Sequence, residues 1–213
     1  MKTNDLIDLL AADVVPVRRH VAARRLALGL ALAVPLSVLM MHTMLGVNPA
    51  LGHALGLPMF WVKFGSPVLM ALAALPLVAR LGRPGAATRA AWAAWGSPVV
   101  ALWVLGLLAL ARAPAPEAAT LVLGRTWAVC AENVALLSLP VFLVAIWTLR
   151  GLAPVCPARA GAGAGALAGA CGAAVYALHC PEFTAPFVAV WYVLGMALPV
   201  AAGALLGRRL LRW

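Results

Sequence analysis

The feature that most limits how this chain can fold is a succession of apolar runs, each roughly 20 residues long, separated by short polar turns. A helix of that length crosses the ~30 Å hydrocarbon layer of a membrane, and backbone groups in lipid must pair internally, which favours helices. The composition agrees, because 65% of the residues are hydrophobic and 10% are charged, whereas soluble domains carry about 25% charged residues. The sequence predicts an all-α, multi-pass membrane protein.

We predict a six-helix transmembrane bundle over residues 26–207, with a cytoplasmic segment before it (1–25) and a cytoplasmic tail after it (208–213). The predicted spans are 26–46, 59–79, 91–111, 132–149, 160–178 and 187–207. Prolines inside these runs are compatible with membrane helices, because neighbouring groups can satisfy the carbonyls that a proline leaves unpaired.

The distribution of the basic residues predicts the orientation of the bundle. Lysine and arginine accumulate on the cytoplasmic side of membrane proteins, and a bundle with its N-terminus inside places 13 of the 16 basic residues there. Both termini are therefore predicted to be cytoplasmic. Lys63 is expected just inside the outer end of its span, where its ammonium can snorkel outward. The arginines lie between apolar runs and form no single patch, so direct nucleic-acid binding is not expected.

The N-terminal segment "MKTNDLIDLLAADVVPVRRHVAARR" predicts a helix of about three turns that ends before Pro16. Its apolar residues recur at helical spacing and its acidic residues, including Asp5 and Asp8, face the other way. Such a helix can lie on the membrane surface or dock into a groove of a soluble partner. Anionic lipid would repel its acidic face, which favours a basic protein partner.

The predicted outer face gathers chemically active side chains. Cys130 and Cys180 fall there, together with His179, Glu132 and Glu182, and the stretch "ALHCPEFTAP" brings several of them together. Two outer thiols can form a structural disulfide, act as a redox switch, or bind a soft metal ion with the neighbouring imidazole and carboxylates. No C-x-x-C pair, H-E-x-x-H motif or glycine-rich phosphate loop occurs, so no enzyme is predicted.

The fifth predicted span is rich in glycine and alanine. Gly161, Gly165 and Gly169 recur every four residues and share one helix face, which allows close approach of another helix. That face can pack inside one chain, the alternative we favour, or form a homodimer. Cys171 on the same span is expected to be a small packing residue, and Cys156 falls in an inner loop.

Three segments resemble the negative-regulator-of-sigma-F family of bacterial membrane anti-sigma factors: "LPMFWVKFGSP", "GRTWAVCAENVALLSLP" and "VYALHCPEFTAPFVAVWYVLGMALP". The resemblance covers essentially the whole chain and includes the opening "MKTNDLIDLLAADVVPV". It implies a six-helix protein of the inner membrane that holds an extracytoplasmic-function sigma factor and responds to heavy-metal or oxidative stress. It also implies that two outward-facing cysteines take part in the response, which by motif match are Cys130 and Cys180.

The resulting hypothesis is a two-state switch. The residues expected to bind the sigma factor are Leu6, Ile7, Leu9, Leu10 and Val14, flanked by Asp5 and Asp8. A transient heavy-metal ion or an oxidant at Cys130 and Cys180 would weaken that contact, and no permanent cofactor is expected. The alternatives are a membrane redox or metal-handling protein that uses Cys130, Cys180 and His179 directly, without a sigma partner, and a purely structural membrane subunit.

Overall fold

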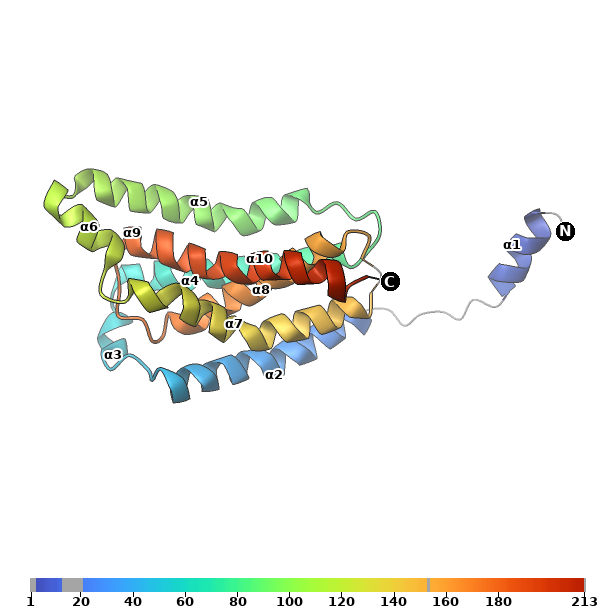
Figure 1. Ribbon diagram of the computed structural model, residues 1–213, viewed down its shortest axis with the longest axis horizontal. Coiled ribbons are helices and arrows are strands. Elements are labelled where there is room, and N and C mark those ends of the chain that lie inside the picture. The colour runs from blue at the N-terminus through green and yellow to red at the C-terminus, as the bar shows by residue number, and fades with distance from the viewer. Residues whose placement is uncertain (1–2, 13–20, 153, 213) are drawn as a thin grey trace.

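The computed structural model describes residues 3–12, 21–152 and 154–212. Its helices are α1 (Thr3–Ala12), α2 (Val21–Met44), α3 (Leu51–Ala54), α4 (Pro58–Leu81), α5 (Arg89–Arg112), α6 (Ala115–Leu123), α7 (Trp127–Arg150), α8 (Pro157–Tyr176), α9 (Ala185–Phe187), the π-helical turn η1 (Val188–Tyr192) and α10 (Val193–Leu210). The described part of the chain contains no strand, which confirms the predicted all-α class. The long helices lie side by side in a bundle, and α1 stands apart from it (Figure 1).

Within the residues that the structure describes, five segments, and not the predicted six, are long and apolar enough to cross a membrane. These five are Val21–Met44, Pro58–Leu81, Arg89–Arg112, Ala115–Arg150 and Ala185–Leu210. The predicted span 160–178 corresponds to the helix α8, which runs from Pro157 to Tyr176 and whose 20 residues reach about 30 Å. This helix is not among the five because its composition, dominated by glycine and alanine, is less apolar than that of its neighbours.

The low bulk of α8 fits its place inside the bundle. It packs against α4, α7 and α10, and 14 of its 20 residues are buried, so it needs few large apolar side chains to face lipid. Its glycines bring α10 very close, because a Cβ atom at Gly161 or Gly165 would overlap the carbonyl groups of Gly203 or Pro199. The face formed by Gly161, Gly165 and Gly169 is therefore occupied within one chain, and a homodimer has no free surface there.

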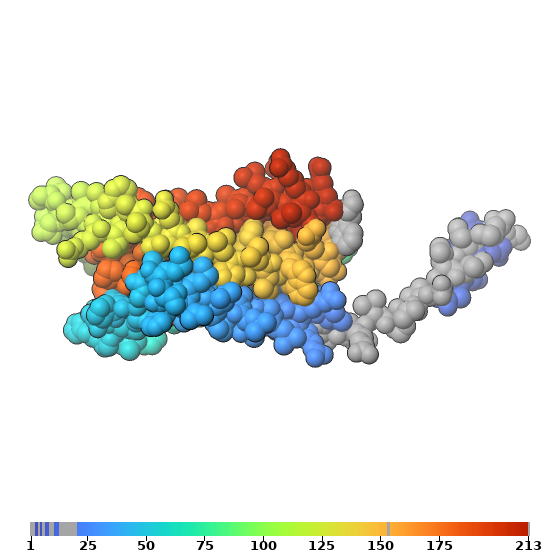
Figure 2. Space-filling model, turned by 60° about the horizontal axis from the view of Figure 1, so that its bottom comes forward, coloured from blue at the N-terminus to red at the C-terminus, as the bar shows by residue number. Residues whose placement is uncertain are grey.

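Large apolar side chains cover the outside of the bundle. Figure 2 shows α2, α7 and α10 along one face, and side chains such as Leu32, Leu143 and Leu205 are exposed on these helices. Contiguous apolar surface of this extent is not tolerated by monomeric proteins in water. An apolar exterior around an interior of small residues is what a lipid environment requires.

The turns of the chain gather at two opposite ends of the bundle (Figure 1). One end carries the connecting segments 45–57, 113–126 and 177–184, the first two of which include the short helices α3 and α6. We call it the thiol end because Cys130 and Cys180 lie there. The other, the basic end, carries the α4–α5 and α7–α8 turns and the last residues of α10. Its described arginines include Arg80, Arg83, Arg89, Arg150, Arg159, Arg208 and Arg209.

Two local features differ from the predictions. The outer loop expected between the third and fourth spans contains a further helix, α6, and α7 begins at Trp127, five residues before the predicted span. The predicted N-terminal helix is confirmed as α1, which ends at Ala12. Val14 and Pro16 lie outside the described residues.

Candidate functional site

The segment 177–184 lies at the thiol end and is fastened to three other parts of the chain. The backbone N–H of Asn48 donates to the carbonyl oxygen of Leu178 at 3.2 Å. The hydroxyl of Thr184 donates to the carbonyl oxygen of Leu121, at the end of α6, at 2.8 Å. The third attachment, from α4, is the side chain of Lys63. A turn between two helices is thereby held as a fixed structural part.

Lys63 is fully buried, and this corrects the expectation that its ammonium snorkels outward. Its Nζ atom donates to the carbonyl oxygen of Cys180 at 2.7 Å and to that of Glu182 at 3.0 Å. The same atom lies 4.1 Å from the centre of the Phe183 ring, within the range of a cation–π interaction. Lys63 was not among our predicted site residues, although an ionisable residue within an apolar run is a recognised functional signal.

Cys130 and Cys180 come together in one cluster of buried side chains. Both thiols are free and fully buried, and Cys130 lies in the first turn of α7 rather than in a loop. Two buried tyrosines complete the surroundings: the Tyr176 hydroxyl lies beside the Cys130 thiol, and that of Tyr192 lies beside the Cys180 thiol. Among the described residues, neither hydroxyl has a partner at full hydrogen-bond geometry.

Tyr192 reaches this cluster from the π-helical turn η1, which sequence periodicity did not predict. Such turns insert an extra residue into a helix and are frequent at functional sites. Here η1 joins α9 and α10 into one helix and carries the fully buried Tyr192 ring. The rings of Tyr176 and Tyr192 lie 5.7 Å apart, so both tyrosines pack together beside the two thiols.

The other predicted metal ligands do not join the thiols in one site. Glu132 is exposed on α7, whereas Cys130 is buried, because residues two apart on a helix face different ways. The Glu182 carboxylate accepts from the backbone N–H of Arg125 at 2.8 Å. The Nδ1 atom of His179 lies 2.8 Å from the carbonyl oxygen of Gly46, which can only accept, so Nδ1 carries the proton. Within the described chain, no three histidine, cysteine or carboxylate side chains form a metal site.

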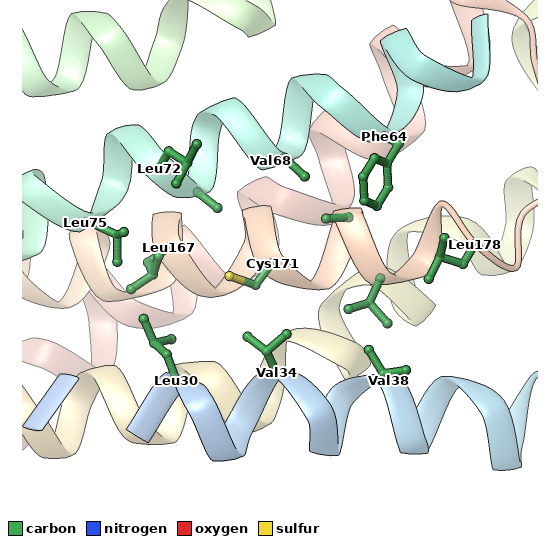
Figure 3. A pocket seen from close by; sticks show the side chains of 13 residues that line it. Leu30, Val34, Val38, Phe64, Val68, Leu72, Leu75, Leu167, Cys171 and Leu178 are labelled. Carbon is green, nitrogen blue, oxygen red and sulfur yellow. The ribbon is translucent and has the colours of Figure 1, made fainter. Parts of the chain in front are cut away.

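The two remaining cysteines lie in different surroundings. Cys156 is exposed in the turn between α7 and α8, at the basic end. Cys171 lies on α8 at the floor of an apolar groove of about 450 Å³ between α2 and α4. Figure 3 shows Leu30, Val34 and Val38 of α2 along one wall of this groove. Cys171 is thus partly exposed to the groove rather than fully packed.

The predicted partner-binding helix is only partly described. Ile7 is 56% exposed on α1, and Asp5 and Asp8 are exposed on the same helix. The side chains of Leu6, Leu9 and Leu10 lie outside the described residues, as does Val14. The described part of α1 therefore offers an exposed apolar residue flanked by carboxylates.

These observations define a class: a polytopic helical membrane protein with two neighbouring buried thiols at one end and a separate acidic helix near the other end. A family model described as "Negative regulator of sigma F" matches residues 10–213. The chain belongs to this family, which confirms the resemblance seen in the sequence.

Two relatives match along their entire lengths. The "Probable anti-sigma-F factor NrsF" of Azospira oryzae (strain ATCC BAA-33 / DSM 13638 / PS) is 46% identical over 213 residues, and all of both chains is covered. The "Anti-sigma-F factor NrsF" of Caulobacter vibrioides (strain NA1000 / CB15N) is 39% identical over 214 residues, again with all of both chains covered. No solved structure matches the chain. The names of the relatives denote regulators, not enzymes.

Proposed function

We propose that this protein is an inner-membrane anti-sigma factor that holds a sigma factor of the extracytoplasmic-function class and releases it under heavy-metal or oxidative stress. The observation that carries the proposal is the full-length match, at 46% and 39% identity, to two proteins named as anti-sigma-F factors. The match includes the N-terminal helix as well as the bundle, so the proposed partner-binding part and the membrane part are both shared.

The helix α1 is the proposed contact with the sigma factor. Ile7 is exposed in the free chain, and burying such a side chain in a groove of a partner contributes about 1.5–3 kcal/mol. The carboxylates of Asp5 and Asp8 lie on the same helix, and they favour a partner whose groove has a basic rim. Leu6, Leu9, Leu10 and Val14 complete the proposed apolar face.

The proposed orientation rests on the difference in charge between the two ends of the bundle. Arginines gather at the basic end, and positively charged turns remain in the cytoplasm. Because α2 begins at that end (Figure 1), α1 is expected on the side where a sigma factor and RNA polymerase are found. In this orientation both termini are cytoplasmic, and the thiol end faces the periplasm.

The thiol pair is the proposed sensor. Hydrogen peroxide can oxidise the thiols of Cys130 and Cys180 to a disulfide while it is itself reduced to two molecules of water. A soft metal ion can instead bind to the two deprotonated sulfur atoms. Either reaction changes the packing of a cluster that α7, α8 and the segment 177–184 share. A moderate coupling to α1, of about 1–3 kcal/mol, is typical of allosteric proteins and is sufficient to alter sigma binding.

The first experiment tests the partner. The full chain is placed in lipid nanodiscs, and its affinity for the cognate sigma factor is compared with that of the Ile7→Asp and Ala12→Asp variants. Loss of a buried apolar contact predicts an affinity about tenfold or more lower for Ile7→Asp. Ala12→Asp adds the same charge at the end of the helix and should bind nearly as the parent does. Equal binding by all three proteins would remove α1 as the contact.

The second experiment tests the sensor. The variant Cys180→Ser should capture the sigma factor normally and fail to release it on treatment with a peroxide or a thiol-binding metal ion. Cys156→Ser is the matched control, because this thiol is exposed at the other end of the bundle, and it should respond as the parent does. Release from Cys180→Ser at the parent's peroxide or metal concentration would show that the signal enters elsewhere.

A further inference from the structure

Lys63 is a buried ammonium whose hydrogen-bond partners all come from one short segment. It donates to the carbonyl oxygens of Cys180 and Glu182, and it lies over the ring of Phe183. No carboxylate in the described part of the chain forms an ion pair with it. A charge removed from water is strongly unfavourable unless other groups replace its hydration. The position of Lys63 and the position of the segment 180–183 therefore depend on each other.

The same segment carries one of the two buried thiols. Cys180 presents its carbonyl oxygen to Lys63 and its thiol to the cluster that contains Cys130. Both sulfur-bearing side chains are fully buried. A reagent can reach buried thiols only through a local opening of the fold, and an opening that displaces the segment 180–183 would break the contacts of the ammonium. The free energy of this opening therefore includes the loss of the Lys63 contacts.

We infer that Lys63 is the positioning residue of the thiol pair: it holds the segment 180–183 against α4 and so sets how often Cys130 and Cys180 become accessible to an oxidant or a metal ion. Lys63 does not react itself. The inference deepens the proposed function, because it rests on these two thiols being the sensing groups. It assigns the threshold of the sensor to a residue of α4, whereas Cys130 lies on α7 and Cys180 lies in the segment between α8 and α9.

The test measures thiol accessibility directly. The variants Lys63→Met and Lys63→Arg are made in the full chain carrying Cys156→Ser and Cys171→Ser, so that only Cys130 and Cys180 can react with a small maleimide. The labelling rate of a buried thiol is proportional to the fraction of time that its surroundings are open. Loss of hydrogen bonds from a charged donor should raise the rate by about tenfold or more in Lys63→Met.

Three comparisons keep the result specific. Lys63→Arg retains the charge and the donors and should give a rate between those of the parent and Lys63→Met. Leu69→Met alters an exposed residue of the same helix and should leave the rate unchanged. Phe183→Leu removes only the aromatic face and should raise the rate less than Lys63→Met does. If Lys63→Met fails to fold, judged by its thermal unfolding, the Arg and Phe183 variants decide the question.

Unchanged labelling in the folded Lys63→Met variant would overturn the inference. If that variant does not fold, unchanged labelling in both Lys63→Arg and Phe183→Leu would overturn it. Sigma binding is measured on the same preparations. If neither the parent nor any variant binds the sigma factor, the proposed function fails. The labelling result still decides the role of Lys63 in that case. If the sigma factor binds and labelling does not respond to the Lys63 and Phe183 variants, only the role of Lys63 is lost.

Discussion

Gly124 illustrates how single residues shape the thiol end. It has φ +56° and ψ −154°, a backbone conformation that is essentially restricted to glycine. A Cβ atom there would lie 2.8 Å from the carboxylate carbon of Glu182 and 2.8 Å from a ring carbon of Phe187. The absence of a side chain lets the next residue, Arg125, bring its backbone N–H to the Glu182 carboxylate.

A comparison of Gly124→Ala with Gly46→Ala separates the cost of backbone strain from the cost of steric overlap with neighbouring side chains. Gly46 also has a positive φ, +79°, but a Cβ atom added there would have no neighbouring atom within 4 Å. Both variants should lose about 1–3 kcal/mol of stability from backbone strain. Gly124→Ala should lose more, because Glu182 and Phe187 must move. Unfolding in detergent measures the difference, and equal losses would contradict the packing at Gly124.

At the scale of helices, the close contact of α8 and α10 holds the interior of the bundle together. Gly161 and Gly165 of α8 meet the backbone of α10 directly, and Gly203 of α10 meets the backbone of Gly161 in return. Helices in lipid associate through such packing, since lipid provides no hydrophobic drive between them. The same contact fixes α8, whose last turn leads into the segment that carries Cys180.

Substitution at this contact has a sharp expected outcome. Gly165→Ala should lower the free energy of unfolding by about 1–3 kcal/mol, because the added methyl group overlaps the backbone of α10. Gly96→Ala is the matched control: Gly96 lies in α5 with no neighbour within 4 Å, and alanine has the higher helix propensity. Its stability should be unchanged or greater. A stable Gly165→Ala protein would mean that α8 and α10 are further apart.

At the scale of the whole molecule, the proposed signal and its effect lie at opposite ends of the bundle. The helix α4 connects them: Lys63 is near its beginning, and Arg80 is in its last turn at the basic end. α8 runs beside it and leads from the basic end to Cys180. A displacement at the thiol end can therefore be transmitted through the packed helices α4 and α8 to the basic end, where α2 begins.

Cys156 provides a test of the orientation. It is the exposed cysteine at the basic end, whereas Cys130 and Cys180 are buried. A membrane-impermeant maleimide should label it in inside-out vesicles and not in intact spheroplasts, because the positively charged turns are expected in the cytoplasm. The variant Cys156→Ser should lose this labelling. Labelling from the outside of spheroplasts would reverse the assignment of both termini.

Hydropathy, charge and short motifs are local properties of the chain, and they were enough to predict the all-α class, the approximate positions of the long helices and the family. They also indicated Cys130 and Cys180 as a pair. The inward turn of Lys63, the burial of both thiols and the outward position of Glu132 became known only from the three-dimensional arrangement of the helices. These outcomes depend on groups more than a hundred residues apart, such as Lys63 and Cys180, and the free energy of a buried charge depends on which partners the fold brings to it.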